Sequence, residues 1–283
     1  MQLQDHLESD INEKLLWLKN CCDPWETVED YWTITAKTRL TRLQSNEYTI
    51  QQYFSEFKPL NQPGGIFLLL KDYAHLYPGN NQTLSGNWLL MRPKLIKLAK
   101  NRSDAFLKDM LADIDHEQRE EVMDLAALMA IPFLMTTSNV GKSKNKTKPK
   151  RLWRPSKQEV LEGFIIHVKC AAHIEDTIAR RAEKLREMEL TLQPSIVIVG
   201  PSIKEISGRY IIVNNVRYEV TSIINAVDAC FKIIFVLNAQ YPAESNNVWQ
   251  FIQTALYQIK TKYDKIYTTV NTLMTDLNIQ QGE

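Results

Sequence analysis

The chain has 283 residues, of which 44% are hydrophobic and 24% charged, and its formal net charge is +1. This length suits one large domain or two ordinary ones. The hydrophobic content is that of a globular protein, and a count of only 9 glycines argues against a loop-rich all-β fold.

Cysteine usage and the N-terminal sequence both bear on the compartment. The four cysteines include an adjacent pair, Cys21 and Cys22, and they do not resemble a disulfide framework. Residues 1–13 are polar and acidic, without the apolar run of a signal peptide. We therefore expect an intracellular protein in a reducing compartment.

The first half of the chain is predicted to be helical. Apolar residues recur at helical spacing over residues 9–20, 24–43, 49–57, 66–77, 93–112 and 116–131. The first helix should bury Leu15, Leu16 and Leu18. The second should begin at Asp23-Pro24, with Asp23 as its cap, and bury Trp25, Val28, Trp32, Ala36 and Leu40. Asp115 and Gln118 have the spacing of a capping box for the last helix.

Residues 136–155 lose this periodicity and are rich in Lys, Thr, Ser, Asn and Pro, which predicts a flexible linker. The expected organisation is a helical domain over 1–135, a basic linker over 136–156 and an α+β domain over 157–283.

After the linker, residues 157–190 are predicted to form one long helix. Its apolar stripe at 3-4 spacing consists of Leu161, Phe164, Val168, Ala171, Ile178, Ala182 and Leu185. Such a stripe is typical of a packing seam. It could dock on the sheet, or it could form a homo-oligomer as a coiled coil with a second copy.

The last third predicts a strand, a hairpin and two helices. The β-branched run 194–199 indicates a buried strand, and residues 209–220 a β-hairpin that turns at Asn214-Asn215. Residues 222–237 predict a helix that is apolar except for one stripe, formed by Asn225, Asp228 and Lys232. This helix is too short and too charged to span a membrane, so no membrane contact is expected.

A second amphipathic helix is predicted over residues 243–262. Its buried face should hold Val248, Ile252, Ala255, Leu256 and Ile259, with Trp249 at the edge. The expected fold class is α+β and predominantly α-helical, with a small antiparallel sheet of one strand and a hairpin packed by helices.

Several short motifs resemble one group of proteins. In the C-terminal block they are Gln193-Pro-Ser-Ile-Val-Ile-Val-Gly200, Tyr210-Ile-Ile-Val213, Ala226-Val-Asp-Ala-Cys-Phe-Lys232, Phe235-Val-Leu-Asn238, Tyr241-Pro242 and Val248-Trp-Gln-Phe-Ile252. They resemble uncharacterised animal proteins that carry the label "sterile alpha motif domain-containing-like". The upstream half of that family is resembled by Phe57, Asp72-Tyr73, Leu76-Tyr77, Trp88 and Pro93-Lys94. No sterile alpha motif domain is evident, and the resemblance implies no activity and no site residues.

The best metal candidate is the trio His167, Cys170 and His173. On a helix these residues would span about 9 Å of rise, which is too far for one tetrahedral ion. Gly141-Lys142-Ser143 resembles the end of a phosphate loop, but Thr136 stands where that motif needs its first glycine. We assign no catalytic, cofactor-binding or metal-binding residue.

Acidic residues are dense between the two predicted helices before the linker: Asp109, Asp113, Asp115, Glu117, Glu120, Glu121 and Asp124. Two-metal nucleases use such carboxylates when they converge from separate elements. A charged helix junction is the structural alternative.

The basic segment, residues 141–157, is the most function-like feature. It holds eight cations and no acid, so subtracting them from the net charge of +1 leaves about −7 for the rest of the chain. Lysine-rich stretches neutralise phosphates without reading bases, residues 148–154 resemble a short import signal, and Trp153 could stack on a base. The site residues are Lys142, Lys144, Lys146, Lys148, Lys150, Arg151, Trp153, Arg154 and Lys157. A plain linker is the structural alternative.

The leading functional hypothesis is a non-enzymatic interaction or scaffold protein, in the nucleus rather than the cytoplasm, with nonspecific nucleic-acid contact through the basic segment. Descent from a mobile element is a further hypothesis. The alternative is a metal-dependent nucleic-acid-processing enzyme that uses scattered Asp and Glu residues. Such an enzyme would show three or more carboxylates converging in one pocket. The sequence names no cofactor and no particular protein partner.

Overall fold

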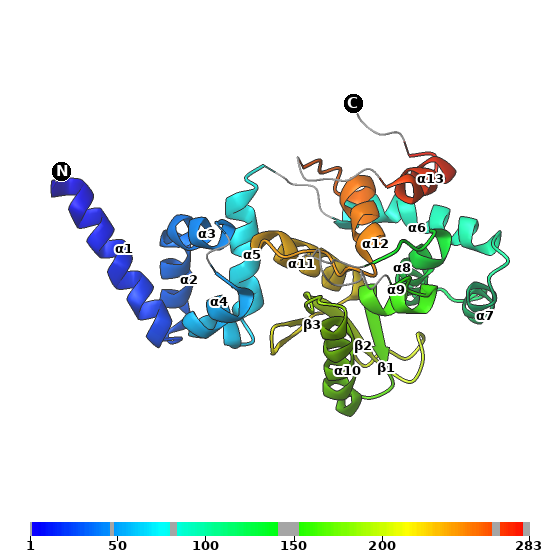
Figure 1. Cartoon of the computed structure of the whole chain (residues 1–283), viewed down its shortest axis with the longest axis horizontal. Helices are drawn as coiled ribbons and strands as arrows, with labels where there is room; N and C mark the ends of the chain where they lie inside the picture. The colour runs from blue at the N-terminus through cyan, green and yellow to red at the C-terminus, as the bar shows by residue number, and fades with distance from the viewer. Residues whose placement is uncertain (1, 46–47, 80–83, 141–152, 262–266, 280–283) are drawn as a thin grey trace, which may run out of the picture.

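The computed structural model describes residues 2–45, 48–79, 84–140, 153–261 and 267–279. The chain has the predicted α+β fold, which is predominantly helical (Figure 1). Before residue 140 the helices are α1 Gln2–Asn20, α2 Trp25–Ile34, α3 Ala36–Gln44, α4 Ile50–Glu56, η1 Lys58–Asn61, α5 Gly65–Leu76, α6 Leu84–Lys100, α7 Ala105–Asp113 and α8 Glu120–Leu134. After residue 153 they are α9 Lys157–Phe164, η2 Ala171–His173, α10 Ile174–Glu187, α11 Ile223–Val236, α12 Asn246–Phe251, a π-helical turn Ile252–Leu256 and α13 Thr268–Asp276.

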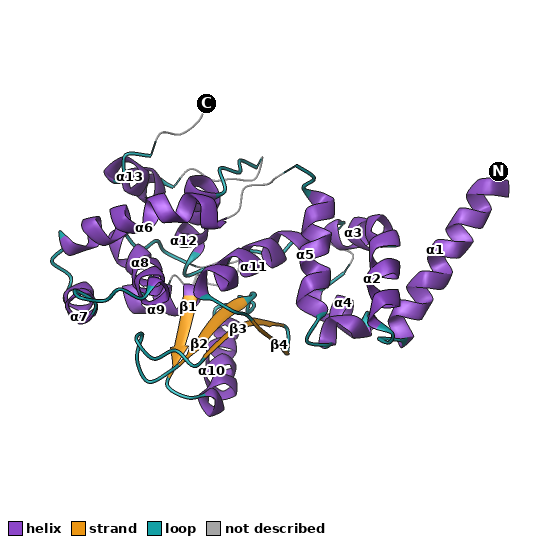
Figure 2. Cartoon of the chain, turned by 180° about the vertical axis from the view of Figure 1, so that it is seen from behind, coloured by secondary structure: helices purple, strands orange, loops and turns teal. Residues whose placement is uncertain are grey.

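Four strands form one mixed sheet in the order β1-β2-β3-β4, drawn in orange in Figure 2. They are β1 Ile165–Val168, β2 Ser195–Val199, β3 Gly208–Val213 and β4 Val216–Glu219. The hairpin of β3 and β4 is antiparallel and turns at Asn214, whose φ of 55° confirms the predicted turn. β1 runs parallel to β2, with Ile165 opposite Ile196. The prediction of an antiparallel sheet is therefore wrong for this strand pair.

The strands alternate their apolar side chains between two buried faces. Ile166, Val197 and Ile212 point to a small cluster completed by Ile174 and Ile178 of α10, the helix that connects β1 to β2. A parallel pair needs such a crossover, and it covers one face of the sheet. The opposite face, with Ile196 and Ile211, belongs to the main core.

α11 lies at the centre of that main core (Figure 1). It packs against α5 on one side, α8 and α6 on another and strands β2 and β3 on a third. Ser222 caps its N-terminus by accepting a hydrogen bond from the Asn225 backbone. Lys232 donates to Asp228 at 2.6 Å, but both side chains are only about one fifth exposed, so the polar stripe is less solvated than predicted.

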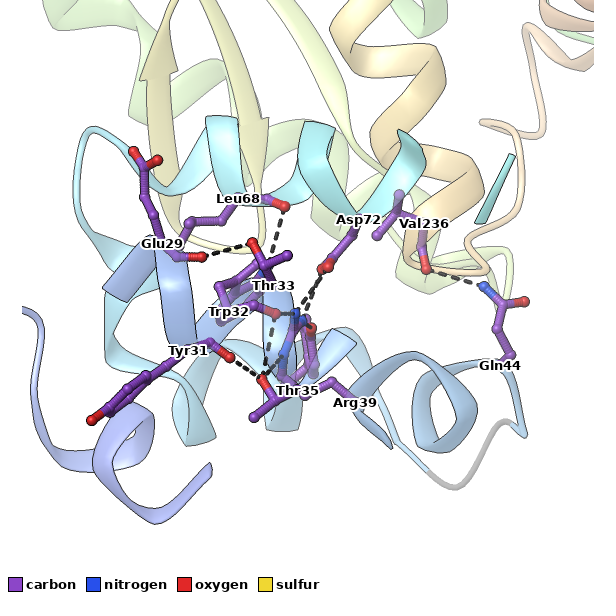
Figure 3. Close-up of polar contacts among 11 residues, drawn as sticks. Glu29, Tyr31, Trp32, Thr33, Thr35, Arg39, Gln44, Leu68, Asp72 and Val236 are labelled. Carbon is purple, nitrogen blue, oxygen red and sulfur yellow. Dashed lines mark hydrogen bonds and ion pairs between the residues drawn. The ribbon is translucent and has the colours of Figure 1, made fainter. Parts of the chain in front are cut away.

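A fully buried ion pair connects the N-terminal helices (Figure 3). Arg39 of α3 donates two hydrogen bonds to the Asp72 carboxylate on α5, both at 2.9 Å, and its guanidinium lies 3.5 Å from the centre of the Trp32 ring. Arg39 also donates to the Tyr53 hydroxyl at 2.6 Å and to the Trp32 carbonyl at 2.6 Å. Burial raises the pKa of Asp72, and the guanidinium opposes this shift by favouring the carboxylate.

The predicted long helix over residues 157–190 is wrong. The chain leaves the helix after Phe164, forms β1, and starts α10 at Ile174. Ile165, Ile166 and Val168 are buried in the sheet, so the continuous apolar stripe predicted for this helix is not formed. The reason is that a β-branched run can pair with β2, and this nonlocal pairing overrides the local helical spacing.

Several predicted boundaries also move. The helix over 24–43 breaks at Thr35, the one over 93–112 divides into α6 and α7, and the one over 243–262 ends its regular part at Leu256. Pro24, rather than Asp23, is the N-cap of α2, and Arg119 rather than Asp115 is that of α8; neither makes a side-chain cap.

Several burial predictions fail as well, including those for Ile259, which is half-buried, and Ala171, which is exposed. Leu16 is 60% exposed, Trp25 is only half-buried, and Trp249 is fully buried rather than at an edge. Trp249 is enclosed because Phe164 and Tyr241 pack against its ring.

The described ends of the predicted linker contact the rest of the chain. The Thr136 backbone donates to Thr269 at 2.9 Å, and Asn247 donates to Ser138 at 2.9 Å. One cluster of buried side chains includes residues on both sides of the linker, such as Trp88 and Phe231. The division into two domains stays a prediction. Among the described helices, none combines the length and apolar character needed to cross a membrane.

The burial of α11 can be tested with two substitutions to aspartate on the same helix. Phe231 is fully buried and stacks on Tyr257 at 3.9 Å, so Phe231→Asp should lower the free energy of unfolding by at least about 3–5 kcal/mol. Asn225 is exposed in the first turn, where a negative charge is favourable, so Asn225→Asp should be close to neutral. Urea unfolding measures both changes. Equal midpoints for the two variants would show that Phe231 is not in the core.

The buried ion pair makes a second stability prediction. Asp72→Asn or Arg39→Met leaves one group without its partner and should cost about 3–5 kcal/mol in urea unfolding. The double variant should cost less than the sum, because no buried charge is left unpaired. The control is Lys71→Met on the same helix, whose exposed pair with Glu29 at 2.5 Å contributes about 0–1 kcal/mol. Additive single effects would contradict the coupling between Arg39 and Asp72.

Candidate nucleic-acid interface

The predicted basic segment lies only partly within the described residues. Six of its site residues fall outside them: Lys142, Lys144, Lys146, Lys148, Lys150 and Arg151. Trp153, Arg154 and Lys157 are described, and all three contact the folded chain.

The two ends of this segment are joined to each other. Val140 and Trp153 form an antiparallel bridge, in which the Val140 backbone donates to the Trp153 carbonyl at 2.7 Å and receives a hydrogen bond back at 2.9 Å. The residues that flank positions 141–152 are therefore hydrogen-bonded to each other. Arg154 strengthens this base by donating to the Thr137 hydroxyl at 3.2 Å.

Trp153 is less available for base stacking than the sequence suggested. Its side chain is half-buried, and the Lys184 ammonium of α10 lies 4.7 Å from the ring centre. A cation over an aromatic face is itself a favourable contact, and it competes with a stacked base for that face. Trp153 therefore serves first to hold the base of the segment.

Lys157, the last cation of the segment, reaches another part of the molecule. It donates to the Phe133 carbonyl at the end of α8, at 2.8 Å, and its ammonium lies 3.7 Å from the Asp104 carboxylate. Asp104 caps α7 by accepting from the Leu107 backbone. The basic segment thus ends beside the turn between α6 and α7.

This turn carries a second group of cations that the sequence reasoning missed. Residues 92–108 contain one acid, Asp104, and the six cations Arg92, Lys94, Lys97, Lys100, Arg102 and Lys108. A local charge count would have found this group. The helical periodicity of the same residues drew attention to their packing instead.

Two shallow hollows lie along these cations. The first, of about 470 Å³, lies between α6 and α8 and is lined by Arg92, Pro93, Ile96, Lys97, Lys100, Asn101 and Met123. The second, of about 330 Å³, lies between α6 and α7 and is lined by Ala99, Lys100, Lys108, Leu111, Ala112 and Asp115. Lys100 belongs to both, so the hollows form one continuous surface.

Half of these six cations are engaged by acids. Arg92 donates to Asp124 at 2.9 Å, Lys100 pairs with Asp115 at 2.8 Å, and Arg102 pairs with Asp276 at 3.0 Å. The hydrogen bond from Lys100 lowers the pKa of Asp115, so this carboxylate stays charged at neutral pH.

The other half of the group has free ammonium groups. Lys94, Lys97 and Lys108 are exposed, and none of them has an ion-pair or hydrogen-bond partner within the described part of the chain.

The predicted metal and carboxylate candidates do not converge. The Nε2 atom of His167 lies 2.9 Å from the Gly200 carbonyl oxygen. Cys170 and His173 are exposed, and the Cys170 Sγ lies 3.5 Å from the His173 Nδ1. His167 lies on β1, Cys170 directly precedes η2 and His173 ends η2, so the three are not on the one helix for which their spacing was calculated. Among the described residues, no group of three or more His, Cys, Asp or Glu side chains is placed to hold a metal ion. Most of the clustered acids instead pair with cations, as Glu121 does with Arg209.

Comparisons with known proteins add no relative to this description. No family model, no curated protein and no solved structure matches the chain.

Proposed function

We propose that this chain is a non-enzymatic interaction protein that contacts the phosphates of nucleic acid, without reading base sequence, through the basic segment of residues 141–157. The observation that carries the proposal is the joined base of the segment. Val140 and Trp153 join the two ends between which six of the eight cations lie in the sequence, and the rest of the chain carries a net charge of about −7.

Charge supports this choice of ligand. Duplex DNA carries one negative charge per about 1.7 Å of its axis, and each lysine that neutralises a phosphate releases condensed counterions. Lysine contributes as a point charge without the bidentate geometry that favours particular groups. A lysine-rich segment therefore favours affinity over sequence specificity.

The environment of Trp153 supports a contact of this kind. Base stacking would require its ring, but Lys184 lies over that ring. The cations of the segment are the groups that remain for a polyanion. We also propose that the protein is nuclear, because residues 148–154 have the composition of an import signal.

The salt dependence of binding tests the ligand class. With four or five phosphates engaged, the basic segment should contribute a slope of about −4 to log K against log salt. Replacing Lys144, Lys146, Lys148, Lys150 and Arg151 with glutamine should reduce the magnitude of the slope by about that amount. Fluorescence anisotropy with short labelled duplexes of several sequences measures it. Unchanged binding by the variant, or a strong preference for one duplex sequence, would count against the proposal.

Localisation is tested with the same five substitutions. In cells, the chain fused to a fluorescent protein too large to diffuse through the nuclear pore should concentrate in the nucleus. The variant should lose that concentration, because the import receptor needs the clustered positive charge. Equal nuclear fluorescence for the two fusions would leave the segment without an import role.

A further inference from the structure

We propose that the surface of α6 and α7 around Lys94, Lys97, Lys100 and Lys108 is a second phosphate-binding site, which takes the backbone of the same nucleic acid that the basic segment holds. The proposal takes its ligand from the proposed function, but it depends on different residues. All four lysines lie in the described, folded part of the chain.

Three lysines form a row along α6. Lys94, Lys97 and Lys100 follow one another at intervals of three residues, so each is displaced by about 4.5 Å along the helix axis from the previous one. Residues three apart are neighbours on a helix surface. The result is a row of ammonium groups rather than a single cation, and a row suits the repeated charges of a phosphate backbone.

The surface beside these lysines is hollowed. Lys97 and Lys100 line the hollow of about 470 Å³ together with Ile96 and Met123, and Lys100 and Lys108 line the hollow of about 330 Å³. Both hollows are shallow, so an extended chain can lie along them.

The last cation of the basic segment lies near the start of α7. Lys157 lies 3.7 Å from Asp104, and Asp104 precedes Lys108 by four residues, on the same side of α7. The described end of the basic segment therefore lies close to the start of α7, the helix that carries Lys108.

The acids of this region define the limits of the site. Asp124 and Glu120 hold Arg92, and Asp115 holds Lys100, so these two cations contribute less than the unpaired ones. Asp109 and Asp113 lie exposed on the neighbouring side of α7, where they would repel a polyanion. The free charge is therefore concentrated at Lys94, Lys97 and Lys108.

Charge neutralisation at these three residues tests the site. The triple variant Lys94→Gln, Lys97→Gln and Lys108→Gln should weaken binding to a labelled duplex of arbitrary sequence. It should also reduce the magnitude of the salt slope by about 2 to 3, close to one per lysine. The matched control changes three other exposed lysines, Lys37, Lys58 and Lys169, and removes the same net charge. The control should change the slope by less than about 1.

The outcomes separate this site from the segment. If the triple variant behaves like its control while the segment variant loses binding, the second site is overturned and the proposed function stands. If the triple variant loses binding while the segment variant does not, the proposed function of the basic segment is overturned and the second site stands. A triple variant that keeps its affinity for duplex but loses affinity for poly-glutamate overturns the choice of nucleic acid in favour of an acidic peptide.

The acetylation rates of individual lysines in the unsubstituted chain test the second site independently of the variants. Acetylation of Lys97 and Lys108 should slow when duplex is added, whereas that of Lys37 and Lys169 should not. Equal protection at all four positions, or none, would overturn the site even if the triple variant failed to fold.

Discussion

The burial of α11 is the constraint on which the rest of the structure depends. Its side chains are apolar on almost every side, so water must be excluded from almost all of the helix surface. The chain meets this requirement by packing α5, α6, α8 and the sheet around it. The elements that surround α11 come from both halves of the sequence, and the two halves therefore share one core.

Polar groups buried in this core fix the arrangement of the helices. The Arg39 guanidinium satisfies Asp72, Tyr53 and the Trp32 carbonyl together, which leaves α3 and α5 one relative placement. Arg181 and Glu244 form a second buried pair between α10 and the turn before α12. Here Gly163 is required, because a Cβ on it would lie 2.3 Å from the Glu244 side chain. Such pairs specify geometry more than they add stability.

The same packing creates the basic surface. Docking of α9 against the end of α8 carries Lys157 to the α6–α7 turn, and the stacked rings of Phe106 and Phe133 hold that turn in place. Lys157, the last cation of the basic segment, then lies beside the turn that joins α6 to α7. The acids of the α7–α8 junction pair with Arg92 and Lys100, and Asp276 of α13 pairs with Arg102, which leaves the free charge of this group on three exposed lysines.

The sequence by itself determined the fold class, the hairpin and its turn, and the apolar character of α11, because each depends on residues close together in the chain. Only the tertiary structure decided that residues 165–168 form a strand, since its hydrogen bonds come from β2, about thirty residues later. It also decided which charges pair: Arg39 meets Asp72, and Lys157 meets Asp104. No local pattern encodes these contacts, because they exist only once distant segments pack around α11.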